Sequence, residues 1–518
     1  MNIAYKGTFL REGLLLNGHQ VHDLTLNEGG DLQAALKAAP FPVDLVIWEL
    51  FGGYSNIHAL APCEQPLVGY CIDTPLNEFW IKNCAKNFDH VFVDQPQCVP
   101  SLAAHGIEAS WLPLPAKNAY FQPPREKKHT LTFIGSTTAQ RLKRTNLLRL
   151  IRSRVDIHCM SGLDVAASQK IFSQSRIILN ENYFPGLTLR VLQGLSAGSI
   201  VFTEQSPYGH DFGLEDGRDL VTYTPHTVLE RLAELVEKHE DFAAIGLHGQ
   251  ETCRRLFSSG KVAAELLARV GTAQKKAPCG DDAAYLWNQA AAELLFVQRF
   301  GGSLGRAMRR LGGLANSCPD RAAAAHVLMG DVEATLNREA SAREHYRKAL
   351  EMAPDSTANL KLAFLDIRRN EPDAALRALL AYLHHAGNTA GAGLEGRLSA
   401  AGGATPQALL LALAGIYLDL GRPWDMGFHK DSPDPVPDTA LAAARLSWEC
   451  APSSAALELM LQCLRPAHME GELLPTLLGA LKMGLLSPVQ ILDTARLAYE
   501  YYDRETAAAI MSAMKKAR

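Results

Sequence analysis

The sequence predicts an α/β protein with an all-α extension. Three observations favour this architecture over the 518 residues. Short apolar runs alternate with helix-length intervals through residues 1–275, which is typical of strands buried on both faces of a parallel sheet. A proline-rich stretch at 112–124 divides this part in two. From residue 283 onward, alanine- and leucine-rich helical segments replace the apolar runs.

The composition is that of a folded protein with several domains. Hydrophobic residues make up 47% of the chain and charged residues 20%, so the chain can bury sizeable cores. The 51 Lys and Arg residues nearly balance the 55 Asp and Glu residues, which gives no electrostatic reason to expect a nucleic-acid partner. The ten cysteines form no C-x-x-C pair, so a zinc ribbon or a thioredoxin-type site is not expected. Unpaired cysteines in a chain of this size suit a reducing compartment. Because we see no secretory signal and no apolar run of membrane-spanning length, we expect a cytoplasmic protein without an integral membrane segment.

Residues 1–115 are predicted to form a first Rossmann-like domain. Its strands are expected at 3–5, 45–48, 67–72 and 90–93, where apolar runs are bounded by polar or turn residues. The intervals between these runs are long enough for the crossover helices that a parallel sheet requires. A linker is expected at 116–127, because the four prolines of the stretch 112–124 fit neither a helix nor a central strand.

Residues 128–275 repeat this alternation and are predicted to form a second Rossmann-like domain. The expected strands are 130–134, 155–159, 176–180 and 199–203, and the expected helices are 141–153, 189–197, 229–238 and 260–270. Gly198 ends the second of these helices. Two such domains in tandem leave a cleft between them, and ligands bind outside the carboxyl ends of the strands in sheets of this kind.

Residues 283–518 are predicted to form an α-helical solenoid. Within 320–354, the spacing of Gly330, of Ala342, Tyr346 and Ala349, and of Pro354 is that of the tetratricopeptide repeat (TPR), a helical hairpin of 34 residues. A weaker copy is expected at 357–385, and further hairpins at 406–421 with 438–452 and at 455–518. Because these repeats are irregular, their number is left open.

Several nucleotide and metal motifs are absent from the sequence. It has no G-x-G-x-x-G after its first strand, no G-x-x-x-x-G-K-[ST], no H-E-x-x-H and no D-x-D. These absences argue against a dinucleotide dehydrogenase, a P-loop enzyme, a zincin and a metal-dependent glycosyltransferase.

A first candidate phosphate site is the turn after the strand at 130–134. Gly135 and Ser136 begin a turn of small residues that leads into a helix, where backbone N–H groups can approach an anion. Arg141, with Lys143 and Arg144, could pair with phosphate oxygens. The alternative is an ordinary turn between a strand and a basic, solvated helix.

A second candidate site lies at 180–198, where a strand, a Pro-Gly loop and a helix follow one another. The loop comes after the carboxyl end of its strand and so faces the expected cleft. Arg190 lies in the first turn of the helix, where its charge opposes the helix dipole unless an anion is bound there. The alternative is an arginine on a solvated helix face.

Residues 177–203 resemble the carboxyl-terminal domain of GT-B glycosyltransferases, in particular the CgeB-like (spore maturation protein) branch of the glycosyl transferase group 1 families. That branch reads R-x-F-E-A-x-A-x-G where this sequence reads R-V-L-Q-G-L-S-A-G, at 190–198. Similar segments are F-I-G-S at 133–136 with Arg141, and D-T-P at 73–75. The resemblance covers roughly residues 40–270.

The resemblance implies a metal-independent site for a nucleotide-activated sugar, UDP- or GDP-linked, in the second domain. The implied donor-binding residues are Gly135, Ser136, Arg141, Gly186, Leu187, Thr188, Arg190 and Gln193. Basic residues and backbone amides would neutralise the leaving diphosphate, so the resemblance implies neither a bound metal nor a cofactor. Gln193 departs from the family, because an acid that binds the donor ribose is usual at this position. A glutamine amide can still hydrogen-bond a hydroxyl, but it carries no charge.

The resemblance also implies that the first domain supplies the acceptor chemistry. Asp73 follows an apolar strand and is the first candidate for the general base that an inverting enzyme needs, with Glu49 and Glu78 as further candidates. The alternative for Asp73 is a turn or a helix cap. Retaining GT-B enzymes often use no protein base, so the stereochemistry stays open.

Two functions from different classes follow. The first is a glycosyltransferase of the hexosyl- or N-acetylhexosaminyltransferase type, whose TPR-like region recruits a protein acceptor. By family analogy this acceptor could be a bacterial surface or flagellar protein, and lipid-linked or polysaccharide acceptors remain open. The alternative is a non-catalytic TPR scaffold with a degenerate GT-B ligand-binding module, which the glutamine at 193 favours.

Overall fold

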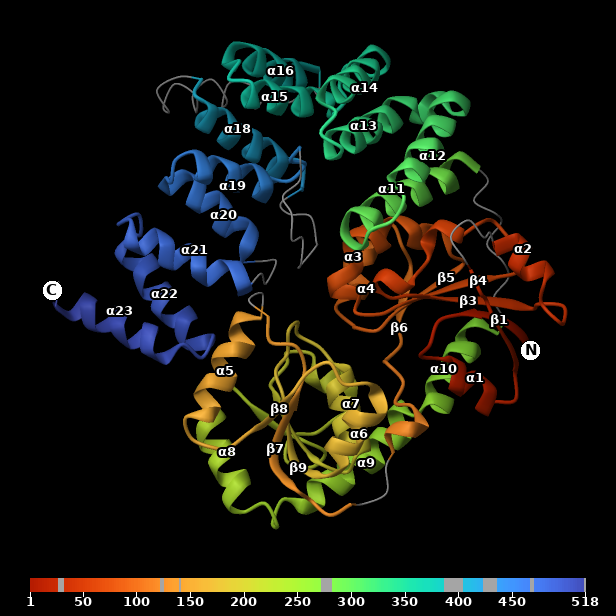
Figure 1. Cartoon of the computed structure of the whole chain (residues 1–518), viewed down its shortest axis with the longest axis vertical. Coiled ribbons are helices and arrows are strands. Elements are labelled where there is room, and N and C mark those ends of the chain that lie inside the picture. Colours follow the sequence, from red (N-terminus) through yellow and green to blue (C-terminus); the bar gives the residue numbers. More distant parts are fainter. Residues whose placement is uncertain are drawn as a thin grey trace. The chain divides into compact units, whose positions relative to one another are not determined.

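The computed structural model describes residues 1–26, 32–121, 125–138, 141–271, 282–385, 404–422, 436–465 and 470–516 (Figure 1). The chain divides into two compact units. One comprises Met1–Asn77, Phe88–Pro278 and Pro488–Arg518, and the other comprises Glu78–Asn87 and Cys279–Ser487. The first unit holds both sheets, and the second is helical.

The first sheet has six parallel strands in the order β2-β1-β3-β4-β5-β6. They are β1 (Asn2–Lys6), β2 (Gln20–Asp23), β3 (Leu45–Leu50), β4 (Leu67–Cys71), β5 (His90–Val93) and β6 (Ala109–Trp111). The four strands predicted from apolar runs correspond to β1, β3, β4 and β5. Strands β2 and β6 escaped prediction because they lie at the sheet edges, are partly exposed and so have no apolar run.

The second sheet has five parallel strands in the order β11-β10-β9-β7-β8. They are β7 (His129–Ile134), β8 (His158–Met160), β9 (Ser175–Asn180), β10 (Ile200–Glu204) and β11 (Val221–Tyr223). The strand expected at 155–159 is shorter and begins later than predicted, because β8 is an edge strand whose residues are only half-buried. Two parallel sheets with crossover helices confirm the prediction of two Rossmann-like domains.

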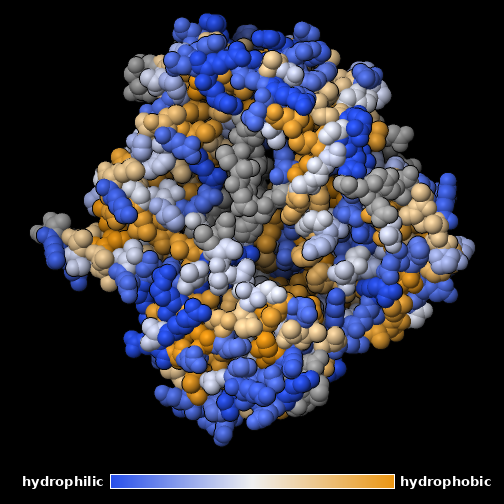
Figure 2. All heavy atoms as spheres, viewed as in Figure 1, coloured by the Kyte–Doolittle hydropathy of each residue, from blue (hydrophilic) through white to orange (hydrophobic). Residues whose placement is uncertain are grey.

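Helices accompany both sheets. In the first domain they are α1 (Arg11–Leu16), α2 (Leu32–Lys37), α3 (Thr74–Cys84) and α4 (Cys98–Ala103). In the second they are α5 (Leu142–Arg152), α6 (Val165–Ser173), α7 (Leu189–Ser196), α8 (Val228–Glu237), α9 (Ala243–Phe257) and α10 (Ser259–Val270). Figure 2 shows mainly hydrophilic side chains on the outer surface of the second domain, at the bottom of the view.

The two sheet domains share one hydrophobic core. It joins residues of the first domain, such as Tyr70 and Leu112, to Leu187 and Val191 of the second. The described part of the linker predicted at 116–127 belongs to this core, because Ala116 is buried and exchanges backbone hydrogen bonds with 257–259. Its Pro123 and Pro124 lie outside the described residues. The two domains therefore form a single packed body.

The second unit contains helices that pack largely as successive hairpins. They are α11 (Asp282–Phe300), α12 (Leu304–Ser317), α13 (Pro319–Thr335), α14 (Glu339–Met352), α15 (Ala358–Arg368), α16 (Pro372–His385), α18 (Pro406–Asp419), α19 (Ala440–Cys450), α20 (Ser454–Leu464) and α21 (Glu470–Lys482). The α13–α14 hairpin has the close packing that its spacing predicts, since a methyl group on Gly330 would overlap the Tyr346 ring. Asn337 adopts the left-handed conformation between these helices, with φ of +58°. A helical region after the sheets is thereby confirmed, and its assignment to TPR stays a prediction.

The last two helices, α22 (Pro488–Glu500) and α23 (Arg504–Lys516), belong to the first unit. Tyr502, between them, lies in the hydrophobic cluster of the second sheet domain. The helical region that we predict as one domain from 283 to 518 thus packs as two separate parts. No helix among the described residues is long and apolar enough to cross a membrane.

Candidate functional site

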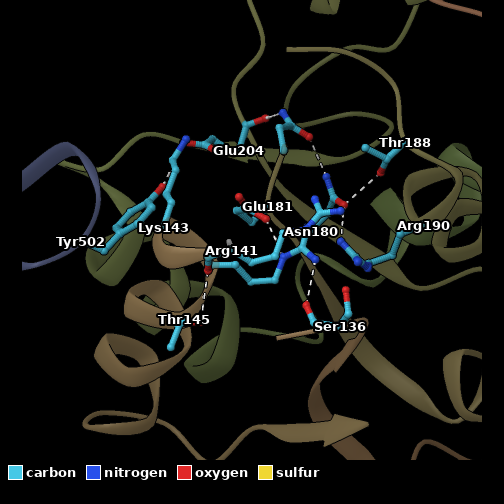
Figure 3. Close-up of polar contacts among 12 residues, drawn as sticks. Ser136, Arg141, Lys143, Thr145, Asn180, Glu181, Thr188, Arg190, Glu204 and Tyr502 are labelled. Carbon is cyan, nitrogen blue, oxygen red and sulfur yellow. Dashed lines mark hydrogen bonds and ion pairs between the residues drawn. The ribbon is translucent and has the colours of Figure 1, made fainter. Parts of the chain in front are cut away.

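Polar side chains gather where strands of both sheets end. Asp73 follows β4, Gly135 and Ser136 follow β7, and Arg190 lies in the first turn of α7, after β9. Figure 3 shows the polar contacts of the second domain at this edge. Because parallel strands present their carboxyl ends at one side of a sheet, this is the expected position of a ligand site.

Asp73 lies in a strained turn that another carboxylate stabilises. Its backbone is left-handed, with φ of +48°, which is rare for a residue other than glycine. The Asp94 carboxylate accepts hydrogen bonds from the backbone N–H of Asp73 (2.9 Å), the backbone N–H of Thr74 (3.1 Å) and the Thr74 hydroxyl (2.7 Å). Asp94 therefore caps α3, and the side chain of Asp73 is left for another role.

The surroundings of Asp73 raise its pKa to about 7. Burial is the main cause, the nearby charge of Asp94 adds to it, and the positive charge of Arg141 opposes both. A carboxyl group with a pKa near 7 can accept a proton at neutral pH and release it again. Asp73 thus has the acid–base property that a general base needs.

Glu49 has a structural role. Its buried carboxylate accepts hydrogen bonds from the Tyr5 hydroxyl and from the backbone N–H groups of Thr8, Phe9 and Leu10. These bonds fix the turn between β1 and α1, and a methyl group on Gly7 would overlap this carboxylate. Glu78, the other further candidate, is buried and belongs to the second unit. Asp73 therefore remains the first candidate for the base.

Arg141 lies flat on an aromatic ring beside Asp73. It precedes α5, and its guanidinium carbon is 3.3 Å from the centre of the Tyr183 ring. This stacking holds the plane of the guanidinium and leaves its N–H edge available. Within the part of the chain that the structure describes, that guanidinium donates no hydrogen bond. Arg141 is therefore a cation that can take an anionic ligand.

Arg190 lies against Gly135. It donates hydrogen bonds to the Ile134 carbonyl (2.8 Å) and to Asn180 Oδ1 (2.9 Å), and it lies over the Phe133 ring. A methyl group on Gly135 would overlap its Nη2 atom, so an alanine here would displace the end of the Arg190 side chain. Burial, with the nearby charge of Arg144, lowers the pKa of Arg190 to about 9, which leaves it charged at neutral pH.

Two other cations of the cluster are already paired with carboxylates. Arg144 Nε is 2.7 Å from Glu181 Oε2, and Lys143 Nζ is 2.7 Å from Glu204 Oε1 (Figure 3). All four side chains are at least four-fifths buried. Sequence reasoning missed both carboxylates, although each follows or ends an apolar strand.

The remaining charge of this cluster is positive. Its four cations are Arg141, Lys143, Arg144 and Arg190, and its two carboxylates are Glu181 and Glu204. Two positive charges are therefore uncompensated before Asp73 is counted. They belong to the two arginines without a carboxylate hydrogen bond among the described residues. A dianionic ligand fits this balance.

The loop before α7 has a different role from the one predicted. Gln95, which follows β5, accepts a hydrogen bond from the Leu187 N–H and donates one to the Leu187 carbonyl, both at 3.0 Å. A methyl group on Gly186 would overlap Gln95 Oε1. The Leu187 amide is thus already used to join the two sheet domains, and we no longer place it at a phosphate. The Thr188 hydroxyl donates to Asn180 Oδ1 (3.0 Å) and fixes the start of α7.

Ser136 and Gln193 keep accessible groups. Ser136 is exposed, and its carbonyl accepts a hydrogen bond from Arg144 Nη1 (3.0 Å). Gln193 lies one helical turn after Arg190, and its side-chain amide has no hydrogen bond among the described residues. Its carbonyl accepts from Gln169 Nε2 (2.9 Å). The amide is therefore free to meet a ligand hydroxyl.

Residues 127–268 match the protein family described as glycosyl transferase-like. The match covers the second sheet domain, which is therefore a glycosyl transferase-like domain, as the resemblance implies for this part of the chain. No curated protein matches the chain. The CgeB-like branch stays a prediction.

Solved structures also resemble the chain. Sucrose-phosphate synthase from Thermosynechococcus elongatus is 11% identical, with a TM-score of 0.39, over 53% of this chain and 100% of the other. Anabaena HepE in complex with UDP-glucose is 10% identical, with a TM-score of 0.36, over 52% of this chain and 100% of the other. TarM is 12% identical, with a TM-score of 0.36, over 43% of this chain and 54% of its own. The chain thus spans about half the length of TarM.

Proposed function

We propose that this chain transfers a hexose or N-acetylhexosamine from a UDP- or GDP-linked donor to a protein acceptor, without a metal ion. The donor binds at the carboxyl ends of β7 and β9. Asp73 takes the proton of the acceptor. The helical unit, as a TPR-like solenoid, holds the acceptor protein.

The observation that carries this proposal is the pair of uncompensated arginines. Arg141 and Arg190 lie at the strand ends of the glycosyltransferase domain, and the cluster around them keeps two positive charges before Asp73 is counted. The diphosphate of a nucleotide sugar carries two negative charges, so side chains alone can neutralise it. Gly135 lets Arg190 approach the backbone of the same turn. The charge that a metal would supply elsewhere is already present.

The proton transfer assigns a definite role to Asp73. The acceptor nucleophile attacks the anomeric carbon, its proton passes to the Asp73 carboxylate, and the nucleoside diphosphate leaves with the bonding electron pair. Arg141 is close enough to Asp73 to lower its pKa, so donor and base lie in one electrostatic neighbourhood. The raised pKa of about 7 suits a group that must take up and release this proton.

A protein acceptor is supported by a cavity in the helical unit. The cavity has a volume of about 300 Å³, and its lining includes Lys82, Trp287, Asp331, Arg422 and Asp438. Asp438 Oδ1 is buried and has no hydrogen-bond partner among the described residues. Such a mixture of charges, an aromatic ring and an unsatisfied acceptor suits the polar side chains of a peptide segment.

One observation favours the alternative of a non-catalytic scaffold. Gln193 stands where an acid usually binds the donor ribose in the resembling family, and it brings no charge to that contact. If this change abolishes donor binding, the sheet domains keep only a structural role and the helical unit carries the function. The test below separates the two functions.

The test is thermal stabilisation by UDP, GDP, ADP, CMP and the corresponding nucleotide sugars, without metal. Wild type is compared with Arg141→Ala, because Arg190 also anchors the backbone and its loss could unfold the site. Arg149→Ala, on the exposed face of the same helix, is the matched control. A ligand at 100 times its Kd adds about 2.7 kcal/mol of stability.

We expect one nucleotide to stabilise wild type and Arg149→Ala, and the effect to be lost in Arg141→Ala. Equal stabilisation of both variants would mean that Arg141 does not bind the donor. No stabilisation of wild type by any compound would leave the scaffold as the function.

A further inference from the structure

The end of the chain returns to the glycosyltransferase domain (Figure 1). Three contacts fix the α22–α23 hairpin there. The Tyr502 hydroxyl donates to Glu204 Oε1 (3.1 Å), Arg504 Nη2 donates to the Pro225 carbonyl (3.1 Å), and the Tyr499 ring lies 4.8 Å from that of His226. These contacts reach the end of β10 and the turn after β11. The hairpin is therefore docked at the edge of the sheet where the donor is proposed to bind.

Tyr502 is part of the domain rather than a surface contact. Its side chain is 3% exposed and belongs to the hydrophobic cluster that includes Leu131 and Phe202 of the second sheet. Its backbone is left-handed, with φ of +61°, at the turn that joins the two helices of the hairpin. A buried aromatic ring of this kind is held by packing, so its hydroxyl has a fixed position.

The hydroxyl of Tyr502 meets a carboxylate that belongs to the donor cluster. Glu204 Oε1 accepts from Tyr502 and pairs with Lys143, while Glu204 Oε2 is buried without a hydrogen-bond partner among the described residues. Tyr223 and Glu181 are the other titratable groups that face it. Lys143 belongs to the same first turn of α5 as Arg144. Figure 3 shows Tyr502, Glu204 and Lys143 in line beside Arg141 and Glu181.

We infer that the C-terminal hairpin is a component of the donor site, in which Tyr502 is a positioning residue that keeps the Glu204 carboxylate on Lys143. This inference rests on the proposed donor site. With Glu204 bound to it, Lys143 does not add its charge to the two arginines, and the cluster stays at two positive charges. Loss of the negative charge of Glu204 would raise the net positive charge of the cluster by one, which would hold the released nucleoside diphosphate more tightly and slow its departure.

The ionisation of Glu204 is the step that the hydroxyl controls. Burial raises the pKa of Glu204, and Lys143 and the Tyr502 hydroxyl both lower it. Removing the hydroxyl therefore raises this pKa further, so Glu204 becomes neutral at a higher pH and no longer offsets the charge of Lys143. In wild type, donor affinity should increase as the pH is lowered through the Glu204 pKa. In a variant without the hydroxyl, the same increase should begin at a higher pH.

The experiment measures donor affinity against pH for the full chain and Tyr502→Phe, with the nucleotide sugar of the panel above that stabilises wild type. A nucleotide sugar is used because its diphosphate does not titrate near neutral pH. Tyr499→Phe is the matched control, since it removes a hydroxyl from the same hairpin that makes no hydrogen bond among the described residues. We expect the midpoint of the affinity profile of Tyr502→Phe to lie at a pH that is higher by roughly one unit. A hydrogen bond to a charged group produces a pKa change of this size.

Urea denaturation at pH 5 and pH 8 shows whether the hydroxyl acts on a titrating group. Because Glu204 holds its proton more tightly in the variant, Tyr502→Phe should lose more stability at pH 8 than at pH 5. An unchanged affinity profile, or an equal displacement in Tyr499→Phe, overturns the inference even if stability changes. Failure of wild type to bind any nucleotide sugar instead refutes the proposed function, so the two failures are distinguishable.

Discussion

Replacing Asp73 by asparagine separates its chemistry from its place in the fold. The change keeps the size of the side chain and removes the only proton acceptor of suitable pKa that we assign to this site. With a pKa of about 7, Asp73 is ionised to about one part in a hundred at pH 5 and about nine parts in ten at pH 8. The kcat/KM of wild type should therefore rise about tenfold per pH unit below pH 7 and level off above it.

The Asn variant should lose this rise and fall by about 10²–10⁴-fold at pH 8, the usual contribution of a general base. The assay is sugar transfer or, before an acceptor is known, donor hydrolysis, followed between pH 5 and pH 9. A wild-type profile without an inflection near pH 7, or an Asn variant within tenfold of wild type at pH 8, would refute the role of Asp73.

Stability provides the control for misfolding. The folded-state pKa of Asp73 lies above its ordinary value of 3.8, so the ionised carboxylate disfavours the folded state. The free energy of unfolding of wild type should accordingly fall as the pH rises from about 4 through 7. The Asp73→Asn variant should not show this decrease, because asparagine does not ionise. Asp73→Asn should therefore resist urea at pH 8 at least as well as wild type does. A less stable variant would mean that its low activity reports unfolding.

Two further substitutions test the geometry of the site. Gly135→Ala places a methyl group on Arg190 Nη2. The Kd of the nucleotide sugar should rise about tenfold, as expected for the loss of one charged hydrogen bond, while the urea midpoint changes little. An unchanged Kd in calorimetry would contradict this contact. Gln95→Ala removes both hydrogen bonds to the loop before α7 and leaves two buried backbone groups unpaired. It should therefore reduce the free energy of unfolding by about 1–3 kcal/mol. A urea midpoint equal to that of wild type would show that the loop does not depend on Gln95.

The sequence could predict the elements of the sheets wherever both faces are buried. The continuous apolar runs of β3 and β4 were found because every residue in them is buried. The edge strands β2 and β6 have no such run, and only their pairing with neighbours reveals them. The shared core of the two sheet domains was also beyond the sequence, since it joins residues more than a hundred positions apart.

The site was predictable only in part, for a similar reason. Gly135 and Arg190 were both expected at strand ends. That they lie against each other, so that a methyl group at position 135 would overlap the arginine, is seen only in the structure. Asp94 was missed although it follows β5 as Asp73 follows β4, because its hydrogen bonds to the α3 turn exist only in the folded sheet. The link from Tyr502 to Glu204 spans 298 positions, and no local pattern connects them.

The four cations of the cluster also show why basic residues in one turn are not equivalent. A sequence with Arg141, Lys143 and Arg144 predicts three possible phosphate ligands, yet the last two are buried against carboxylates. A buried charge without a partner costs several kcal/mol, so Glu181 and Glu204 are needed for the cluster to exist in the absence of ligand. The ligand can then be held only by Arg141 and Arg190, which need no carboxylate to keep them in place. Arg141 is held by the aromatic ring beneath it, and Arg190 by a hydrogen bond to a backbone carbonyl. The charge of the site is thus fixed by its buried carboxylates rather than by the number of its basic residues.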